Sequence, residues 1–114
     1  MPTVEDVRKI ALGMPGAYEQ ASYHGQPSFR TKPRGFAHVR DDVDLVVHLA
    51  DEGEKHALVA ENPAVFHTTP HFDGYAAVLV RLAAVDPVEL RELIVESWRL
   101  RAPARLVKEF DAAQ

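Results

Sequence analysis

The sequence of 114 residues contains no cysteine. Disulfides, thiol nucleophiles and thiolate metal sites are therefore excluded, and the absence agrees with a reducing compartment. No uninterrupted apolar run approaches the roughly 20 residues that a membrane-spanning helix requires. The stretch MPTVEDVRKI carries acidic residues where a signal peptide would carry basic and then apolar ones. We therefore expect a cytoplasmic protein with no membrane partner.

The chain also lacks the positive net charge that is typical of nucleic-acid-binding proteins. Its formal charge is −4, so there is no global attraction to nucleic acid or to an anionic membrane. With 46% hydrophobic and 26% charged residues, the composition is that of an ordinary globular protein. The length suits a single domain over residues 1–114, without an interdomain cleft.

The charges are distributed unevenly along the chain. Residues 24–40 contain four basic residues and no acid, and residues 41–62 contain seven acids against one lysine. Residues 97–108 again contain four basic residues and no acid. Such blocks are usually solvated faces that bind nothing, but they also leave open a dipolar surface.

Apolar spacing and turn-forming residues predict a helix followed by short strands. Thr3 and Asp6 resemble a capping box, and the apolar residues that follow keep helical spacing until Gly13 and Pro15. Three strands are then expected in the segments SFRT, GFAHVR and DLVVHLA, which are separated by KPRG and RDDVD. This part of the chain is typical of an antiparallel meander.

The middle of the chain predicts a short helix and two further strands. The segment EGEKHALVAEN has Ala57 and Leu58 near its expected buried side, and Asn62 and Pro63 end it. The strands are expected in VFHTT and AAVLVRLAAV. The second of these is apolar on both faces, which is typical of the most buried strand of a sheet.

The clearest helix start lies at Asp86, Pro87 and Glu89, which supply an N-cap, a proline at the first helical position and an acid three residues after the cap. A stripe of residues at helical spacing follows: Leu90, Leu93, Ile94, Ser97 and Trp98. We expect this stripe to lie against the strand of residues 76–83. Beyond Pro103, the segment LVKEF is expected to form only a half-ordered turn.

These elements predict a two-layer α+β fold, with a mostly antiparallel sheet and helices on one face, in the order α-β-β-β-α-β-β-α. The other face of the sheet is expected to be at least partly open.

The residues resemble the MmcQ/YjbR family of small bacterial proteins over nearly the whole chain. The resemblance is carried by MPG at 14–16, PSFRT at 27–31, GFA at 35–37, TTPHFDGYAAVLVRL at 68–82 and ELIVESWRL at 92–100. It implies an α+β fold of this same order, grouped with frataxin-like and secretion-chaperone-like architectures. It also implies a DNA-binding role in which the sheet and its hairpins act as paired wings. Asp73 and Tyr75 stand where some relatives carry a basic residue and a tryptophan, which removes one positive contact.

His67 and His71 are four residues apart, and we interpret them as structural. A zinc or copper pair needs two imidazoles aimed at one point and a third ligand, and Pro70 interrupts any helix or strand between them. We expect no metal, no cofactor and no catalytic residue. The serines lack a G-x-S-x-G context and no glycine-rich loop precedes a helix. A cluster of His71, Tyr75 and Arg81 remains an alternative anion site.

The basic hairpin FRTKPRGFAHVR is the strongest binding candidate. Arg30, Lys32 and Arg34 recur every second residue, and a turn with charges at its tip has the shape of a wing that tracks phosphates. The alternative is that these charges bind nothing and only prevent the exposed edge of the hairpin from pairing with another strand. The candidate nucleic-acid-binding residues are Arg30, Lys32, Arg34, His38, Arg40, Arg99, Arg101 and Arg105.

We therefore predict a non-enzymatic module that binds DNA weakly and without sequence preference. The alternative is a protein-interaction or chaperone-like module that uses the open sheet face or dimerises through it. Nucleic-acid binding requires the two basic blocks to merge on the surface, whereas the alternative requires an exposed apolar patch.

Overall fold

The computed structural model describes residues 2–22 and 25–113. It is an α+β fold built on a six-stranded antiparallel sheet with the strand order β1-β2-β3-β4-β6-β5. The strands are β1 Tyr18–Ala21, β2 Pro27–Arg30, β3 Gly35–Arg40, β4 Asp44–His48, β5 Phe66–His67 and β6 Ala77–Arg81. His24, where the first basic block begins, lies outside the described residues.

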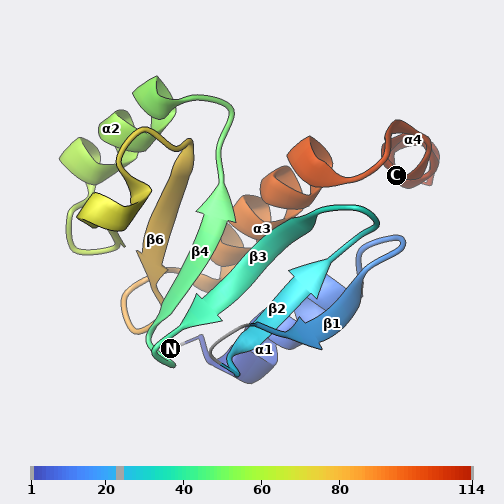
Figure 1. Ribbon diagram of the computed structural model, residues 1–114, viewed down its shortest axis with the longest axis horizontal. Helices are drawn as coiled ribbons and strands as arrows, with labels where there is room; N and C mark the ends of the chain where they lie inside the picture. Colours follow the sequence, from blue (N-terminus) through green and yellow to red (C-terminus); the bar gives the residue numbers. More distant parts are fainter. Residues whose placement is uncertain (1, 23–24, 114) are drawn as a thin grey trace.

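Four α-helices and one 3₁₀ helix accompany the sheet in the described part of the chain. They are α1 Val4–Leu12, α2 Glu52–Glu61, η1 Pro70–Phe72, α3 Pro87–Arg101 and α4 Ala104–Ala112. In Figure 1, α3 passes behind β3 and β4, and α2 and η1 lie at the β6 end of the sheet. Among the described residues, none of these helices combines the length and apolarity needed to cross a bilayer.

The predicted order of elements is confirmed, and the structure adds β1, the short helix η1 and α4. β1 extends the meander to four strands. No sequence signal predicts β1, because its four residues, YEQA, are all exposed and show no apolar–polar alternation. The carboxyl-terminal segment forms the nine-residue helix α4 rather than the half-ordered turn that was expected.

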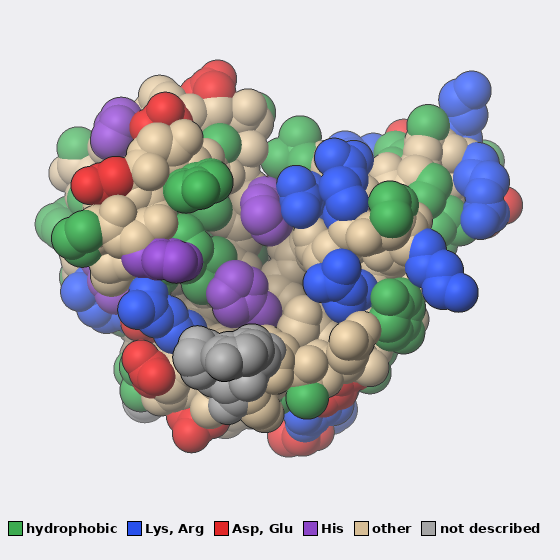
Figure 2. All heavy atoms as spheres, viewed as in Figure 1, with side chains coloured by type: hydrophobic (Ala, Val, Ile, Leu, Met, Phe, Trp, Pro, Cys, Tyr) green, Lys and Arg blue, Asp and Glu red, His purple; other side chains and the backbone are tan. Residues whose placement is uncertain are grey.

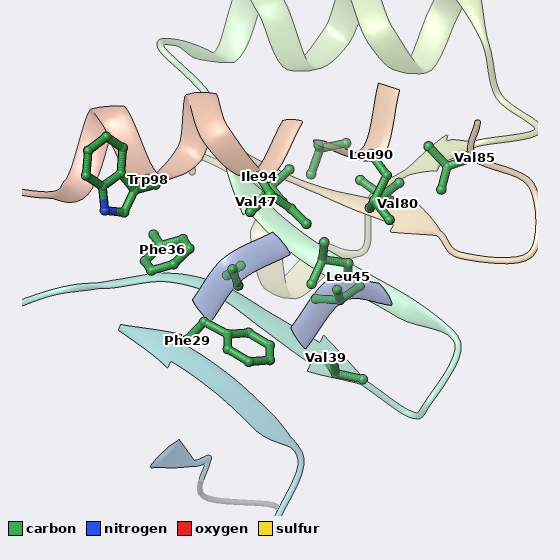
Figure 3. Close-up of a cluster of buried hydrophobic side chains, with 14 of the residues drawn as sticks. Phe29, Phe36, Val39, Leu45, Val47, Val80, Val85, Leu90, Ile94 and Trp98 are labelled. Atoms are coloured by element: carbon green, nitrogen blue, oxygen red, sulfur yellow. The ribbon is translucent and has the colours of Figure 1, made fainter. Parts of the chain in front are cut away.

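Side chains alternate between two apolar clusters on opposite faces of the sheet. Leu45, Val47 and Val80 belong to the main core beneath α1 and α3, part of which is drawn in Figure 3. Val46 and Leu79 point to the other face, where they join a smaller cluster. This arrangement follows from the two-residue period of a β-strand.

Helix α3 begins as the sequence predicts, because the Asp86 carboxylate accepts hydrogen bonds from the backbone N–H groups of Val88 and Glu89. Its stripe is buried except for Leu93, which is half-buried. The expected partner strand was wrong in part: α3 lies mainly on β3 and β4. The reason is that β6 stands next to the edge strand β5, where α2 contacts both of these strands.

Ser97 joins α3 to the sheet. Its hydroxyl donates to the carbonyl of Phe36 and accepts, at 2.8 Å, from the backbone N–H of His48. Ser97 is a small residue on the buried stripe of α3, and its size allows close approach of helix and sheet. The hydroxyl therefore satisfies polar backbone groups of two neighbouring strands, just beyond their last register pair at Ala37 and Val47.

The MPG turn is the meeting point of α1, α3 and α4. Trp98 Nε1 donates to the carbonyl of Pro15 at 3.1 Å, and the Trp98 ring meets Phe110 of α4 edge-on with centroids 5.2 Å apart. Gly16 has φ +72°, and a Cβ there would lie 2.5 Å from Leu106 Cδ1. Glycine is required at this position by both the backbone conformation and the contact.

Candidate functional site

The face of the sheet opposite α1 and α3 carries a groove. Register places His38 beside Val46 on β3 and β4, and His48 beside Ala77 on β4 and β6. Figure 2 looks onto this face and shows histidine side chains next to lysine and arginine side chains around a central hollow. The hollow has a volume of about 580 Å³, which lies within the range of small-molecule and cofactor sites. We refer to it as the groove.

One wall of the groove is basic. It is formed by Arg34 from the turn between β2 and β3 and by Arg101 from the last turn of α3. Arg101 Nε donates to the carbonyl of Gly35 at 3.0 Å, which fixes the end of α3 against the hairpin. A second hollow of about 270 Å³ adjoins the groove and adds Arg30 to the same wall. No Asp or Glu is among the described residues that line either hollow.

The arginines of the basic wall lie close enough to one another to shift the pKa of Arg101. Burial, and then repulsion from Arg34 and Arg30, lowers the pKa of Arg101 below its ordinary value. Guanidinium groups remain charged over the physiological range of pH. The two basic blocks of the sequence therefore meet through three positive charges, and no described residue of the lining supplies a carboxylate to neutralise them.

Two neutral histidines form part of the floor. Burial, followed by repulsion from Arg101, His38 and Arg34, lowers the pKa of His48 to about 4. Burial, and then repulsion from Arg40, also lowers the pKa of His38. A neutral imidazole offers one hydrogen-bond donor and one acceptor. The floor thus supplies polar groups without charge beside a cationic wall.

The other wall is aromatic and comes from the segment around η1. Phe72 packs on Val46, Ala77 and Leu79 and covers the apolar part of the open face, while Tyr75 is 64% exposed. Taken alone, the stretch TTPHFDGY predicts a turn in which Phe72 or Tyr75 packs under the final helix, and this prediction is wrong. Pro70 starts the 3₁₀ turn that carries this segment across the opposite face of the sheet.

Lys55 of α2 holds this aromatic segment in place. Its Nζ donates to the carbonyls of Phe72 at 2.6 Å and Tyr75 at 3.0 Å, and the residue is only 1% exposed. Ala57, which we expected near the buried side of α2, is exposed instead. Lys55 occupies the buried side of the helix, because the loop carbonyls need a donor and its ammonium supplies one.

The remaining candidate residues do not line the groove. Lys32 is exposed at the hairpin turn. Arg40 lies on the far side of Phe72, over whose ring its guanidinium sits at 5.7 Å from the centroid. Arg99 Nη1 bonds to Asp111 at 2.7 Å, and Arg105 is exposed on α4.

His67 and His71 have different surroundings. His67 lies on the edge strand β5, with Nε2 3.0 Å from Asp44 Oδ1. His71 lines the groove and meets the ring of Phe72 edge-on at 5.0 Å. Within the part of the chain that is described, no three His, Asp or Glu side chains come close enough to hold a metal ion.

The alternative anion cluster of His71, Tyr75 and Arg81 is not brought together. Arg81 Nη1 donates to the carbonyl of Pro63 at 2.7 Å, and this arginine is not among the residues that line the groove. The arginines that line the groove together with His71 and Tyr75 are instead Arg34 and Arg101.

Sequence reasoning missed His48 and Leu100, which line the groove, and Lys55, which holds its aromatic wall. One signal was present: Lys55, Leu58 and Val59 share the i, i+3, i+4 spacing of a single helix face. For His48, the pairing of β3 with β4 was needed, since it places alternate residues of both strands on the open face.

Comparison with known proteins agrees with the α+β architecture. A family model described as YjbR matches residues 12–100. Uncharacterized protein Rv2570 of Mycobacterium tuberculosis and Uncharacterized protein Mb2600 of Mycobacterium bovis are each 40% identical to this chain over 124 aligned positions, with 96% of both sequences covered. This chain belongs to the YjbR family.

A solved structure has the same fold. The crystal structure of Deinococcus radiodurans protein DR2400, a DUF419 domain, matches with a TM-score of 0.76 and 24% identity. The match covers 88% of this chain and 78% of that one. At this identity the likeness shows the fold alone, and DUF419 belongs to the same family. The resemblance to MmcQ/YjbR proteins that the sequence indicated is confirmed.

Proposed function

We propose that this protein binds nucleic acid weakly and without sequence preference, and that it does so as a binding module without catalysis. The observation that carries the proposal is the convergence of Arg30, Arg34 and Arg101 on one wall, where no described carboxylate lines the hollows. Guanidinium groups are suited to phosphate because they donate in a planar fork.

The site differs from the wing that the sequence suggested. The hairpin contributes Arg30 and Arg34, and the end of α3 contributes Arg101, whereas Lys32 stays outside the groove. The net charge of −4 opposes approach. We therefore expect a dissociation constant of about 10⁻⁴–10⁻⁶ M, which is typical of non-specific binding.

The alternative, a protein-interaction or chaperone-like module, needs free apolar surface on the open face. Val46, Ala77 and Leu79 are buried there in contact with Phe72. Of the large apolar side chains around the groove, Tyr75 and Leu100 are exposed. A cationic wall beside so small an apolar area favours an anionic ligand over a protein partner or a second copy of this chain.

The test is the salt dependence of binding to a short oligothymidylate. Three arginines contacting roughly three phosphates give a slope of log K against log salt of about −2 for a single strand. Arg34→Glu should make the slope shallower by about one contact and weaken binding at least about tenfold, because a hydrogen bond to a charged group contributes about 1.5–3 kcal/mol.

Lys9→Glu provides the matched control, since Lys9 is exposed on α1 behind the sheet and the charge change is identical. It should leave the slope unchanged. Equal binding by the wild type and the Arg34→Glu variant would refute the proposal, as would a complete lack of binding at low salt.

A further inference from the structure

The aromatic wall faces the basic wall across the groove, and this pairing restricts the kind of nucleic acid that fits. Phosphate contacts alone need only positive charge. The groove adds Tyr75 and Phe72 on the side opposite Arg34 and Arg101. An occupant that satisfies both walls needs an anionic group and a flat apolar surface within the same small unit.

We propose that the groove receives one unpaired nucleobase of a single strand, with its ring against Tyr75 and Phe72 and its phosphate on Arg34 and Arg101. This inference rests on the proposed function and names its substrate class. The groove volume of about 580 Å³ is sufficient for a nucleotide-sized ligand.

Three observations support this occupant. Tyr75 is 64% exposed, so a base can reach its side chain from solvent. The backbone on both sides of this wall is fixed, because Lys55 holds the carbonyls of Phe72 and Tyr75. Neutral His38 and His48 on the floor offer donors and acceptors that match the polar edge of any base.

A paired base cannot occupy the groove in this way, because its flat faces are covered by neighbouring base pairs. Aromatic stacking is tolerant of sequence, since every base presents a π face. The expected preference is therefore for single strands over duplex and for strands that contain bases over strands that lack them.

The experiment compares an oligothymidylate, an abasic strand of the same length, the corresponding duplex and thymidine monophosphate, all titrated at low salt. The oligothymidylate should bind about fivefold or more tightly than the abasic strand, because stacking contributes about 1–3 kcal/mol per base. The duplex should bind less tightly than the single strand. The mononucleotide should also bind less tightly, because it has a single phosphate.

Variants at Tyr75 test the wall directly. Tyr75→Ala should remove most of the difference between the base-containing and abasic strands, while Tyr75→Phe should keep it because the ring is retained. Val88→Ala is the control for loss of exposed apolar surface, since Val88 is 66% exposed at the start of α3. The side chain of Tyr75 is solvated, so these variants should fold normally.

The outcomes distinguish failure of this inference from failure of the proposed nucleic-acid binding. If no strand binds, the nucleic-acid function itself fails. If the abasic strand or the duplex binds as tightly as the oligothymidylate, phosphate binding stands and the base pocket is refuted. If thymidine monophosphate binds as tightly as the strand, the ligand is a free nucleotide and the assignment to a strand is overturned.

Discussion

Replacing Trp98 by alanine should lower the free energy of unfolding by about 3–5 kcal/mol, the range for truncation of a large aromatic core residue. Trp98 is fully buried in the main core, and its Nε1 bonds to the carbonyl of Pro15. The variant loses the packing between α3 and Phe110 of α4. It also leaves the Pro15 carbonyl without this partner.

Urea unfolding of both proteins measures this loss. Val88→Ala, on the same helix but 66% exposed, should change the unfolding free energy by no more than about 0.5 kcal/mol. A loss of less than about 1 kcal/mol for Trp98→Ala would mean that this side chain is not a core anchor.

Replacing Lys55 by methionine should destabilise the protein by about 2–4 kcal/mol, because two loop carbonyls lose their donor and each unsatisfied acceptor costs about 1–3 kcal/mol. Methionine is unbranched like lysine and ends one atom short of the ammonium position, so the change removes the hydrogen bonds to Phe72 and Tyr75 more than the packing. The backbone amides of residues 72–75 should also exchange faster, since this segment loses its tie to α2.

Chemical denaturation and hydrogen exchange check the two parts of this expectation. Lys108→Met is the matched control, because Lys108 is exposed on α4. Should Lys55→Met be as stable as Lys108→Met, the segment around η1 does not depend on α2.

The elements that the sequence predicted well are those with local signals. The cap at Asp86 and the stripe that follows define α3 within a single segment. By contrast, β1 exists because it pairs with β2, and its own residues carry no alternation. The role of Lys55 was missed for a related reason: its hydrogen bonds go to carbonyls of a loop 17 and 20 residues further on.

The candidate site could be predicted only in part, because it is assembled from distant segments. The composition marks the basic hairpin, but the contact between Arg101 and Gly35 joins residues 66 positions apart. It depends on how α3 crosses β3 and β4, which is set by packing across the whole sheet. Arg99, two residues earlier, is instead paired with Asp111. Charge along the sequence therefore did not separate arginines at the groove from those in surface ion pairs.

The central claim is that the groove between Arg34, Arg101 and Tyr75 is the place where nucleic acid binds. The most direct measurement is an NMR titration of the backbone amides with a short oligothymidylate at low salt. Shift changes should be largest in residues 34–38 and 71–77 and at the end of α3, and should saturate together. Changes confined to α1 or to the exposed edge of β1, or no changes at all, would contradict the claim.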